Sequence, residues 1–390
     1  MTDDLPSQAP EGPRRSRLQF TGSGSEYFRL WIVNLLLTLL TLSLYHPFAK
    51  ARQLRYFLGN TLVDGQALGF HGDPWKMLRG HLLVLVFFGC YAGAGQISPV
   101  AGGVAVLIFG ALWPALWQAS LRFRLANTSW RGLRFRFTGD VAGAYRAFWP
   151  LLLPAVVLGA ITASGGSGSA RAEMPLITSL LMVVSVVAML LMGPLGAARI
   201  KRFQHGHYAL ADEATRMEAK TRSFYGLWLR SGLLSLLPIG IFGVAMALIV
   251  AALGRPAGSG GPKIHEAVAV LLPLAVMVVY LLMFLVIQTY FTSRLQNLVW
   301  NATASAHIGF DSRLRCRALA WRTTKNLLLM VCTLGLYRPF AAIHTARLRL
   351  EAVELLLQGD VAQWARSAAA AENDATGDAA ADLLGVDIGL

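Results

Sequence analysis

The sequence predicts a membrane all-α bundle of six spanning helices and two further transmembrane or re-entrant segments, with short cytoplasmic β-hairpins built from internal repeats. Three observations predict it. The 390 residues are 55% hydrophobic and only 14% charged. A mean hydropathy of +0.51 is typical of an integral membrane protein. Long apolar runs alternate with arginine-rich loops that carry variants of one short pattern.

Six apolar runs have the length that a hydrocarbon core of about 30 Å requires, roughly 20 residues each. They cover residues 81–98, 100–119, 148–164, 176–198, 231–254 and 267–290. We assign residues 18–356 to one polytopic membrane domain. A disordered tail (1–17) precedes it, and an Ala/Asp-rich tail (357–390), disordered or at most weakly helical, follows it.

The distribution of basic residues predicts the orientation of the chain. The four loops at 50–79, 119–146, 199–227 and 291–325 hold 23 Lys and Arg residues, whereas the loops between the other ends of the spans hold 3. Because loops rich in Lys and Arg stay in the cytoplasm, we place these four loops there. The net charge of +14 then lies on one membrane face. That placement favours anionic lipid headgroups as a partner over nucleic acid.

The basic loops are related to one another, which predicts an internal repeat. Asn60-Thr61, Gly65, Phe70 and Gly72-Asp73 lie at the same offsets as Asn127-Thr128, Gly132, Phe137 and Gly139-Asp140, and weaker copies run through His207-Tyr208 and Asn301. In one copy Leu133, Phe135 and Phe137 alternate with arginines after a Gly-containing turn, the period of a half-buried strand in a β-hairpin. Because an isolated hairpin is marginal in water, we expect four hairpins to associate into a small sheet or barrel-like layer.

The two end segments, 28–45 and 326–343, allow two topologies. Residues 34–57 align without gaps to residues 326–349, and both copies contain Tyr-x-Pro-Phe-Ala before a basic stretch. About 18 apolar residues is spanning length, so each segment can cross the membrane. The charges on both flanks instead favour a re-entrant or interfacial helix that breaks at Leu-Tyr-x-Pro, because proline removes a helical hydrogen bond.

The first of these copies also carries a family resemblance. Asn34 to Asp73 contains Leu-Tyr-x-Pro-Phe-Ala-Lys-x-Arg, Arg-Tyr-Phe, Gly-Asn-Thr and Asp64-Gly65. In these motifs, in the Asn127-Thr128 block and in the block from Thr333 to Ala341, the chain resembles the YjgN-type family over about residues 18–356. The resemblance implies a multi-pass protein of the bacterial inner (plasma) membrane. It implies no activity, because the family has no established one. The third hairpin departs most, with His205-Gly206-His207 in place of an Asn-rich turn.

Side chains of the basic loops are candidates for contact with lipid headgroups or for docking of a protein partner. A basic residue near anionic headgroups contributes about 1 kcal/mol of attraction, whereas an Asn-Thr pair also suits a local turn. The candidates are Arg52, Arg55, Asn60, Thr61, Arg122, Arg124, Asn127, Thr128, Arg202 and Arg294.

Prolines mark candidate kinks or breaks. Freed carbonyls at such kinks can line a solute path, although proline is also common in ordinary membrane helices. The candidates are Pro47, Pro114, Pro154, Pro194, Pro238, Pro273 and Pro339. The interiors of the six runs hold no ionisable residue, whereas ion-coupled transporters keep one at membrane depth. Asn34 and Asn326 occupy equivalent positions in the end segments, where we expect an interhelical hydrogen bond or a cap at a break.

We expect no catalytic residue, cofactor or metal. His205 and His207 have a spacing that suits a metal on a strand, but no third ligand is evident nearby, and no nucleotide-binding or nucleophile motif occurs. The leading hypothesis is a non-enzymatic scaffold that organises lipid or a partner through its basic cytoplasmic face. The alternative is a channel or facilitative transporter whose path follows the proline-kinked helices.

Overall fold

The computed structural model describes residues 14–165, 176–253, 262–361 and 363–370. It is mostly helical, and six helices of the described part are long and apolar enough to cross a membrane. They are α3 (Pro74–Ile97), α4 (Pro99–Ala126), α5 (Val141–Gly165), α6 (Leu176–His205), α7 (Thr221–Leu253) and α8 (Pro262–Asn301). Each helix continues past its apolar run into a polar end, so the helices are longer than the predicted spans.

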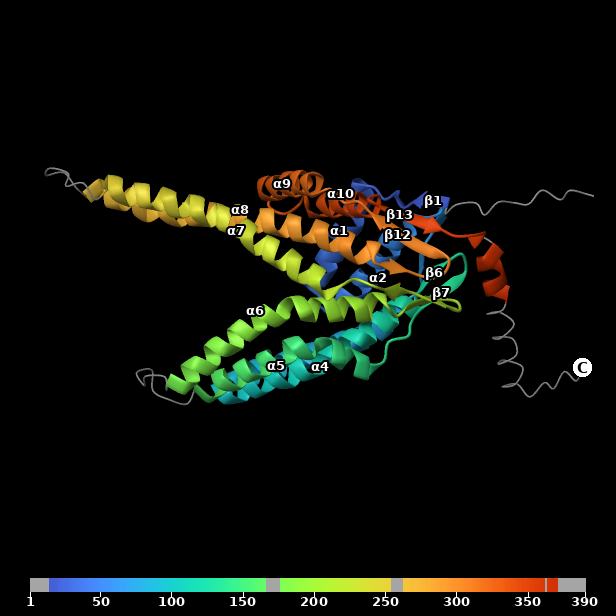
Figure 1. Cartoon of the computed structure of the whole chain (residues 1–390), viewed down its shortest axis with the longest axis horizontal. Helices are drawn as coiled ribbons and strands as arrows, with labels where there is room; N and C mark the ends of the chain where they lie inside the picture. The colour runs from blue at the N-terminus through green and yellow to red at the C-terminus, as the bar shows by residue number, and fades with distance from the viewer. Residues whose placement is uncertain (1–13, 166–175, 254–261, 362, 371–390) are drawn as a thin grey trace, which may run out of the picture.

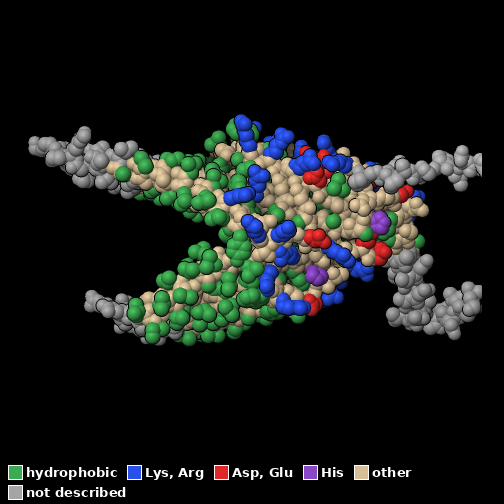
Figure 2. Space-filling model, in the orientation of Figure 1, with side chains coloured by type: hydrophobic (Ala, Val, Ile, Leu, Met, Phe, Trp, Pro, Cys, Tyr) green, Lys and Arg blue, Asp and Glu red, His purple; other side chains and the backbone are tan. Residues whose placement is uncertain are grey.

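The six helices form two arms that diverge from a common base (Figure 1). Helices α3 to α6 pack on one another in sequence order, and α7 packs on α8. The outward faces of both arms carry exposed apolar side chains, such as Leu190 at 68% and Leu237 at 65% exposed. Figure 2 shows these faces as two hydrophobic surfaces with an open wedge between them. A bilayer would cover these surfaces, because soluble proteins rarely expose apolar patches of this extent.

Packing within the larger arm depends on small residues. An added Cβ at Gly196 of α6 would lie 2.6 Å from Cγ of Leu151 on α5. We expect Gly196→Val to lower the free energy of unfolding by about 1–3 kcal/mol, because overpacking forces the helices apart. Thermal unfolding of the purified protein measures this. Gly193→Val is the matched control, since its nearest neighbour would be 3.7 Å away. Equal effects of the two substitutions would contradict the packing argument.

Short strands connect the helices at the base of the arms. They are β1 (Arg14–Arg17), β2 (Gln19–Phe20), β3 (Thr61–Val63), β4 (Gln66–Ala67), β5 (Gly69–Phe70), β6 (Thr128–Trp130), β7 (Leu133–Phe137), β8 (Tyr208–Leu210), β9 (Glu213–Ala214), β10 (Arg216–Met217), β11 (Thr303–Ala304), β12 (Ile308–Ser312) and β13 (Val353–Leu357). Two-residue turns with positive φ at both positions join β3 to β4 (Asp64-Gly65) and β6 to β7 (Arg131-Gly132), as in type I′ hairpins.

These strands close into a ring of antiparallel pairs, which we call the strand ring. Three sheets have the orders β1-β13-β12-β11-β10, β2-β3-β4 and β5-β6-β7-β8-β9. A single residue joins each sheet to the next: Leu18 lies between β1 and β2, Leu68 between β4 and β5, and Thr215 between β9 and β10. Each of these residues donates its backbone N–H to a neighbouring strand. Bent strands that pass from one sheet to the next in this way turn the corners of β-barrels.

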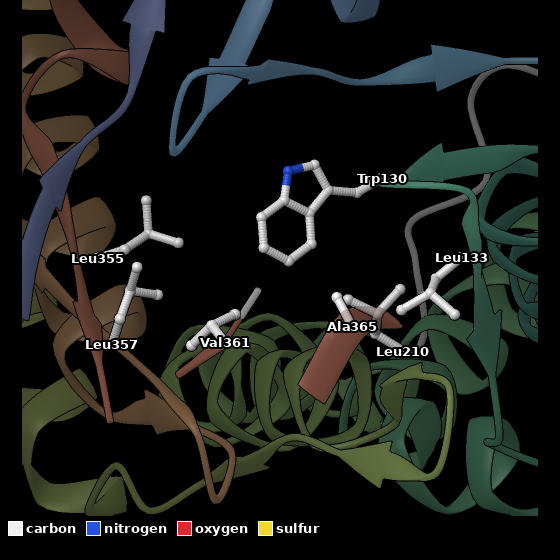
Figure 3. Close-up of a cluster of buried hydrophobic side chains, with 7 residues drawn as sticks. All are labelled: Trp130, Leu133, Leu210, Leu355, Leu357, Val361 and Ala365. Carbon is white, nitrogen blue, oxygen red and sulfur yellow. The ribbon is translucent and has the colours of Figure 1, made fainter. Parts of the chain in front are cut away.

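Buried apolar side chains from several strands and from the segment after β13 cluster in the interior of the strand ring (Figure 3). In β7 the alternating residues Leu133 and Phe137 are buried and the arginines between them are exposed, as the sequence predicts. Trp130, at 1% exposed, lies in a cluster with residues from opposite parts of the ring, including Leu210 and Leu355. Its indole N–H donates to the Val63 carbonyl at 3.0 Å. The ring therefore encloses a hydrophobic core.

The two ends of the chain belong to this core. Strand β1 pairs with β13 from Arg14↔Leu357 to Arg17↔Glu354, although residues 1–17 are predicted as a tail. Beyond β13, residues 361 and 363–370 are helical, and Val361 and Ala365 pack against the Trp130 cluster. The sequence assigns these residues to the second tail. Residues 1–13, 362 and 371–390 of the two predicted tails lie outside the described residues.

Each end segment is a helical hairpin. The hairpins are α1 (Gly24–Leu40) with α2 (His46–Gly59), and α9 (Cys316–Cys332) with α10 (Arg338–Leu350). The hydroxyls of Thr41 and Thr333 bridge the equivalent turns, each donating at 2.7 Å to the carbonyl four residues earlier and accepting the N–H four residues later. Pro47 and Pro339 then lie in the first turn of α2 and α10, where proline is favoured.

Both helical hairpins return to the side of the molecule from which they start. Strand β2 before α1 pairs with β3 after α2, and β12 before α9 pairs with β13 after α10, so both ends of each hairpin return to the strand ring. His81, in the second turn of α3, contacts the carbonyl of Ser43 in the α1–α2 turn at 3.1 Å. This turn is thus level with only the start of α3. A segment that starts and ends at the strand ring has the topology of the re-entrant alternative, and the depth of either hairpin in a membrane stays a prediction.

Candidate functional site

Basic side chains gather where the apolar arms meet the strand ring (Figure 2). The polar ends of the spanning helices and the α2 and α10 helices supply many of them. This boundary between apolar and polar surface is where lipid headgroups would lie. Apart from the prolines within the spans, the predicted site residues belong to the segments at this boundary. Their contacts differ from one residue to the next.

Arg55 and Arg202 anchor helix ends to strand ends. Arg55 donates to the Gly72 carbonyl at 3.3 Å. Arg202 donates to the Ala219 carbonyl at 2.8 Å and to the Thr221 hydroxyl at 2.8 Å. Each anchor reaches a carbonyl 17 residues later, and Asn297 of α8 does the same to Leu314 at 3.0 Å. These two arginines are therefore engaged in holding the fold.

Three further anchors are not among the predicted residues. Besides Asn297, Gln118 of α4 donates to the Gly139 carbonyl at 2.8 Å, and Arg347 of α10 donates to the Gly22 carbonyl at 2.9 Å. The alignment of residues 34–57 with 326–349 already pairs Arg347 with Arg55, and this is the signal that could have found it. Asn297 and Gln118 differ in residue type, so a search for arginines misses them.

The Asn-Thr pairs close helix ends. The side-chain amides of Asn60 and Asn127 donate to the carbonyls four residues earlier at 2.9 and 2.7 Å. The Thr61 and Thr128 hydroxyls do the same at 2.7 and 2.8 Å. Asn60 also accepts from the Thr21 hydroxyl at 3.1 Å. These bonds satisfy carbonyls that a helix C-terminus leaves without partners.

The other four arginines present exposed side chains. Arg122 and Arg124 lie in the last turns of α4, and Arg52 and Arg294 lie on α2 and α8. Arg52 and Arg294 each stack over a tyrosine ring of their own segment, Tyr45 at 5.6 Å and Tyr290 at 5.7 Å. Tyrosine at this level is typical of the membrane interface. This exposed set, Arg52, Arg122, Arg124 and Arg294, is available to headgroups.

The prolines of the spans lie inside helices. Pro114, Pro154 and Pro194 are buried in α4, α5 and α6, Pro238 of α7 is half-buried, and Pro273 of α8 is exposed. They do not converge on one cavity among the pockets described below. Pro150, also buried in α5, is a further proline of the same kind.

Two cavities lie beside α10. The larger, of about 630 Å³, is bounded by α8, α9 and α10, and Asn326 lines it. The smaller, of about 370 Å³, is bounded by α1, α2 and α10, and Asn34 lines it. Both asparagines are more than nine-tenths buried, and the side-chain carbonyl oxygen of each has no hydrogen-bond partner. Arg338 lines both cavities.

The electrostatics of this region are dominated by cations. Lys50 lines the smaller cavity. Desolvation lowers the pKa of its ammonium group, and the charge of Arg124 lowers it further. Asn326 donates to the Ala341 carbonyl and to the Thr345 hydroxyl, so it bonds across its own hairpin as predicted for an interhelical contact. A site of this kind attracts anions.

The two histidines considered as ligands have aromatic surroundings. His205 is buried against Tyr208 and Trp300, and the His207 ring bonds to the Phe203 carbonyl at 2.8 Å. The described residues hold no group of three His, Cys, Asp or Glu side chains placed to bind a metal.

The fold and the basic boundary define a multi-pass helical membrane protein whose helices arise from a ring of strands. A family described as bacterial protein of unknown function (DUF898) matches residues 15–383. The chain belongs to this family and is a multi-pass protein of the bacterial inner membrane.

Three relatives are each called inner membrane protein YjgN. The protein of Salmonella typhimurium is 24% identical over 84% of this chain and 85% of its own length. Those of Escherichia coli K12 and O157:H7 are 28% and 33% identical, over 45% and 34% of this chain and 43% and 34% of their own lengths. No solved structure matches the chain.

Proposed function

We propose that the protein is a non-enzymatic membrane scaffold that gathers anionic lipid around its basic boundary, with the strand ring in the cytoplasm. The observation that carries the proposal is the exposed set of arginines, Arg52, Arg122, Arg124 and Arg294, which lies between the apolar arms and the strand ring. Lysine and arginine near an anionic surface each attract it by about 1 kcal/mol. The excess of basic residues on this side supports the cytoplasmic placement.

We further propose that the hairpins arose by internal duplication. The recurring anchor spacing of 17 residues and the equivalent threonine-bridged turns of the two helical hairpins support a common unit. Repeating one unit around a ring places similar cationic helix ends at regular intervals. Such a ring suits a surface that recognises many lipid headgroups at once.

The transport alternative has less support. Its path was expected to follow the kinked helices, and the prolines concerned do not share one of the described cavities. The interior of the strand ring also holds the hydrophobic Trp130 cluster, which does not suit a polar solute. Within the described part of the chain, the open wedge between the arms (Figure 2) would suit a solute path better than the two cavities beside α10.

Topology is the first test of the proposal. A reporter that is active only in the cytoplasm should be active when fused after Leu390, and one active only in the periplasm should be active when inserted after Gly168. The positive-inside rule gives this result because the basic loops and the strand ring share one side. A periplasmic C-terminus would overturn the orientation.

Lipid preference is the second test. We expect Arg122→Gln with Arg124→Gln to weaken the preference of the full-length protein for phosphatidylglycerol over phosphatidylcholine by about tenfold, since two charges contribute about 2 kcal/mol at most. Spin-labelled lipids in proteoliposomes measure it, and the effect should shrink in high salt. Arg134→Gln with Arg216→Gln, exposed on the strand ring, is the charge-matched control. An equal loss in both variants would contradict a local site.

A further inference from the structure

The cavity between α8, α9 and α10 has the features of a site for one lipid molecule. Its volume of about 630 Å³ lies within the range of small-ligand sites. Gln288, Thr289 and Thr292 line it along α8 on the side toward the strand ring, and Leu281, Phe284 and Leu285 line it farther along the same helix. Because a helix rises 1.5 Å per residue, this wall extends for about 16 Å and changes from polar to apolar along its length.

The apolar end of the cavity is open to the bilayer. Leu281 is 42% exposed and Phe284 is 54% exposed, although both line the cavity. A hydrocarbon chain can therefore pass from the membrane to this wall without crossing polar surface. A free anion in the cytoplasm would make no use of these side chains.

The lining of the cavity offers two arginines, Arg338 and Arg349, and one unused acceptor, and Arg349 already donates to the Gln296 side chain at 2.8 Å. No carboxylate of the described residues is paired with Arg338. Asn326 is 4% exposed, and its side-chain oxygen has no partner even though its amide nitrogen is bonded. A buried acceptor without a donor is costly. A ligand that satisfies the Asn326 oxygen must therefore supply a hydrogen-bond donor. A ligand that pairs with the Arg338 guanidinium group must carry a negative charge.

We propose that this cavity binds one anionic phospholipid whose headgroup also carries a hydroxyl, such as phosphatidylglycerol. The phosphate lies on Arg338, a headgroup hydroxyl donates to the Asn326 oxygen, and an acyl chain lies along Leu281 and Phe284. This inference rests on the proposed function and deepens it, because it replaces a general lipid preference with a single defined site. Phosphatidic acid supplies the charge without the headgroup hydroxyl, and phosphatidylcholine supplies neither a net charge nor a hydroxyl.

Native mass spectrometry of the full-length protein, titrated with each of these three lipids, tests the proposal. We expect one tightly bound phosphatidylglycerol, bound about tenfold more tightly than phosphatidic acid, since an unpaired buried acceptor costs about one factor of ten. Arg338→Gln should weaken phosphatidylglycerol about tenfold, because a charge-assisted bond is lost. Arg79→Gln, an exposed arginine of α3 that lines neither cavity, should leave it unchanged.

The Asn326 site needs its own variant. Asn326→Leu should remove the preference for phosphatidylglycerol over phosphatidic acid, whereas Asn34→Leu, at the equivalent position in the smaller cavity, should keep it. If Asn326→Leu fails to fold, the Arg338→Gln result still decides the matter. The proposal is overturned if no lipid binds with a stoichiometry of one, if Arg338→Gln binds as tightly as the native chain, or if millimolar inorganic phosphate displaces the lipid.

The two lipid proposals fail in different ways. Loss of the general preference in the Arg122 and Arg124 double variant, with the single bound lipid retained, leaves both proposals standing. A double variant that keeps its general preference overturns the proposed function. A native chain that shows this preference but no lipid with a stoichiometry of one overturns only the cavity site.

Discussion

Trp130→Ala is expected to lower the free energy of unfolding by about 3–5 kcal/mol, the usual cost of removing a large buried aromatic side chain. Trp130 is 1% exposed and touches residues from strands around the ring and from the terminal helical segment. The substitution would leave a cavity that neighbouring strands cannot fill, because the closed ring holds them apart. Thermal unfolding of the detergent-solubilised protein, followed by size-exclusion chromatography, measures the change.

Two variants define what the loss means. Trp130→Phe keeps most of the aromatic side-chain volume but removes the hydrogen bond to the Val63 carbonyl. This substitution should lower the free energy of unfolding by about 1–2 kcal/mol. Trp321→Ala removes a tryptophan that is 73% exposed and should change stability by no more than about 0.5 kcal/mol. Similar stabilities for Trp130→Ala and Trp321→Ala would mean that the strand ring is not a packed core.

Arg202→Met is expected to cost about 2–4 kcal/mol, because hydrogen bonds from a charged group are worth roughly 1.5–3 kcal/mol each and their loss leaves buried acceptors. Arg202 joins the end of α6 to Ala219 and Thr221 at the start of α7. Methionine retains the apolar stem, so the loss reports the guanidinium group. Besides a lower unfolding temperature, hydrogen exchange should increase at residues 208–221.

Arg122→Met is the matched control for this prediction. Arg122 lies on α4 in an exposed position, and its loss should change stability by about 0.5 kcal/mol or less. Equal costs for the two arginines would show that the bonds to the strand end contribute little. A cost for Arg122→Met alone would reverse the assignment of anchoring and exposed arginines.

The spanning helices and β7 could be predicted because each has a local signature. An apolar run near 20 residues identifies a span, and the alternation from Leu133 to Phe137 identifies a strand. The end segments could not be decided in this way, because their apolar length also suits a crossing. What turns them is the bridge made by Thr41 and Thr333 together with backbone of positive φ at Leu42 and Leu334.

The roles of the arginines depend on contacts that sequence does not reveal. Arg55 and Arg122 are both exposed basic residues in the sequence segments beside the spans, yet Arg55 donates to the Gly72 carbonyl just after β5. The cavities next to Asn34 and Asn326 exist only because α10 packs against other helices. The strand at residues 14–17, Arg-Arg-Ser-Arg, has no apolar alternation, so its pairing with β13 follows from the closure of the ring and not from its own pattern.

That pairing also constrains how the protein is made. Arg17 and its partner Glu354 are 337 residues apart, so the first strand leaves the ribosome long before the strand that completes its sheet. All six spanning helices can therefore be inserted into the membrane while β1 is still unpaired. A chain that stops before β13 would leave β1 unpaired and one edge of β12 open, and open edges of this kind promote aggregation. The strand ring can therefore close only after β13 has been synthesised.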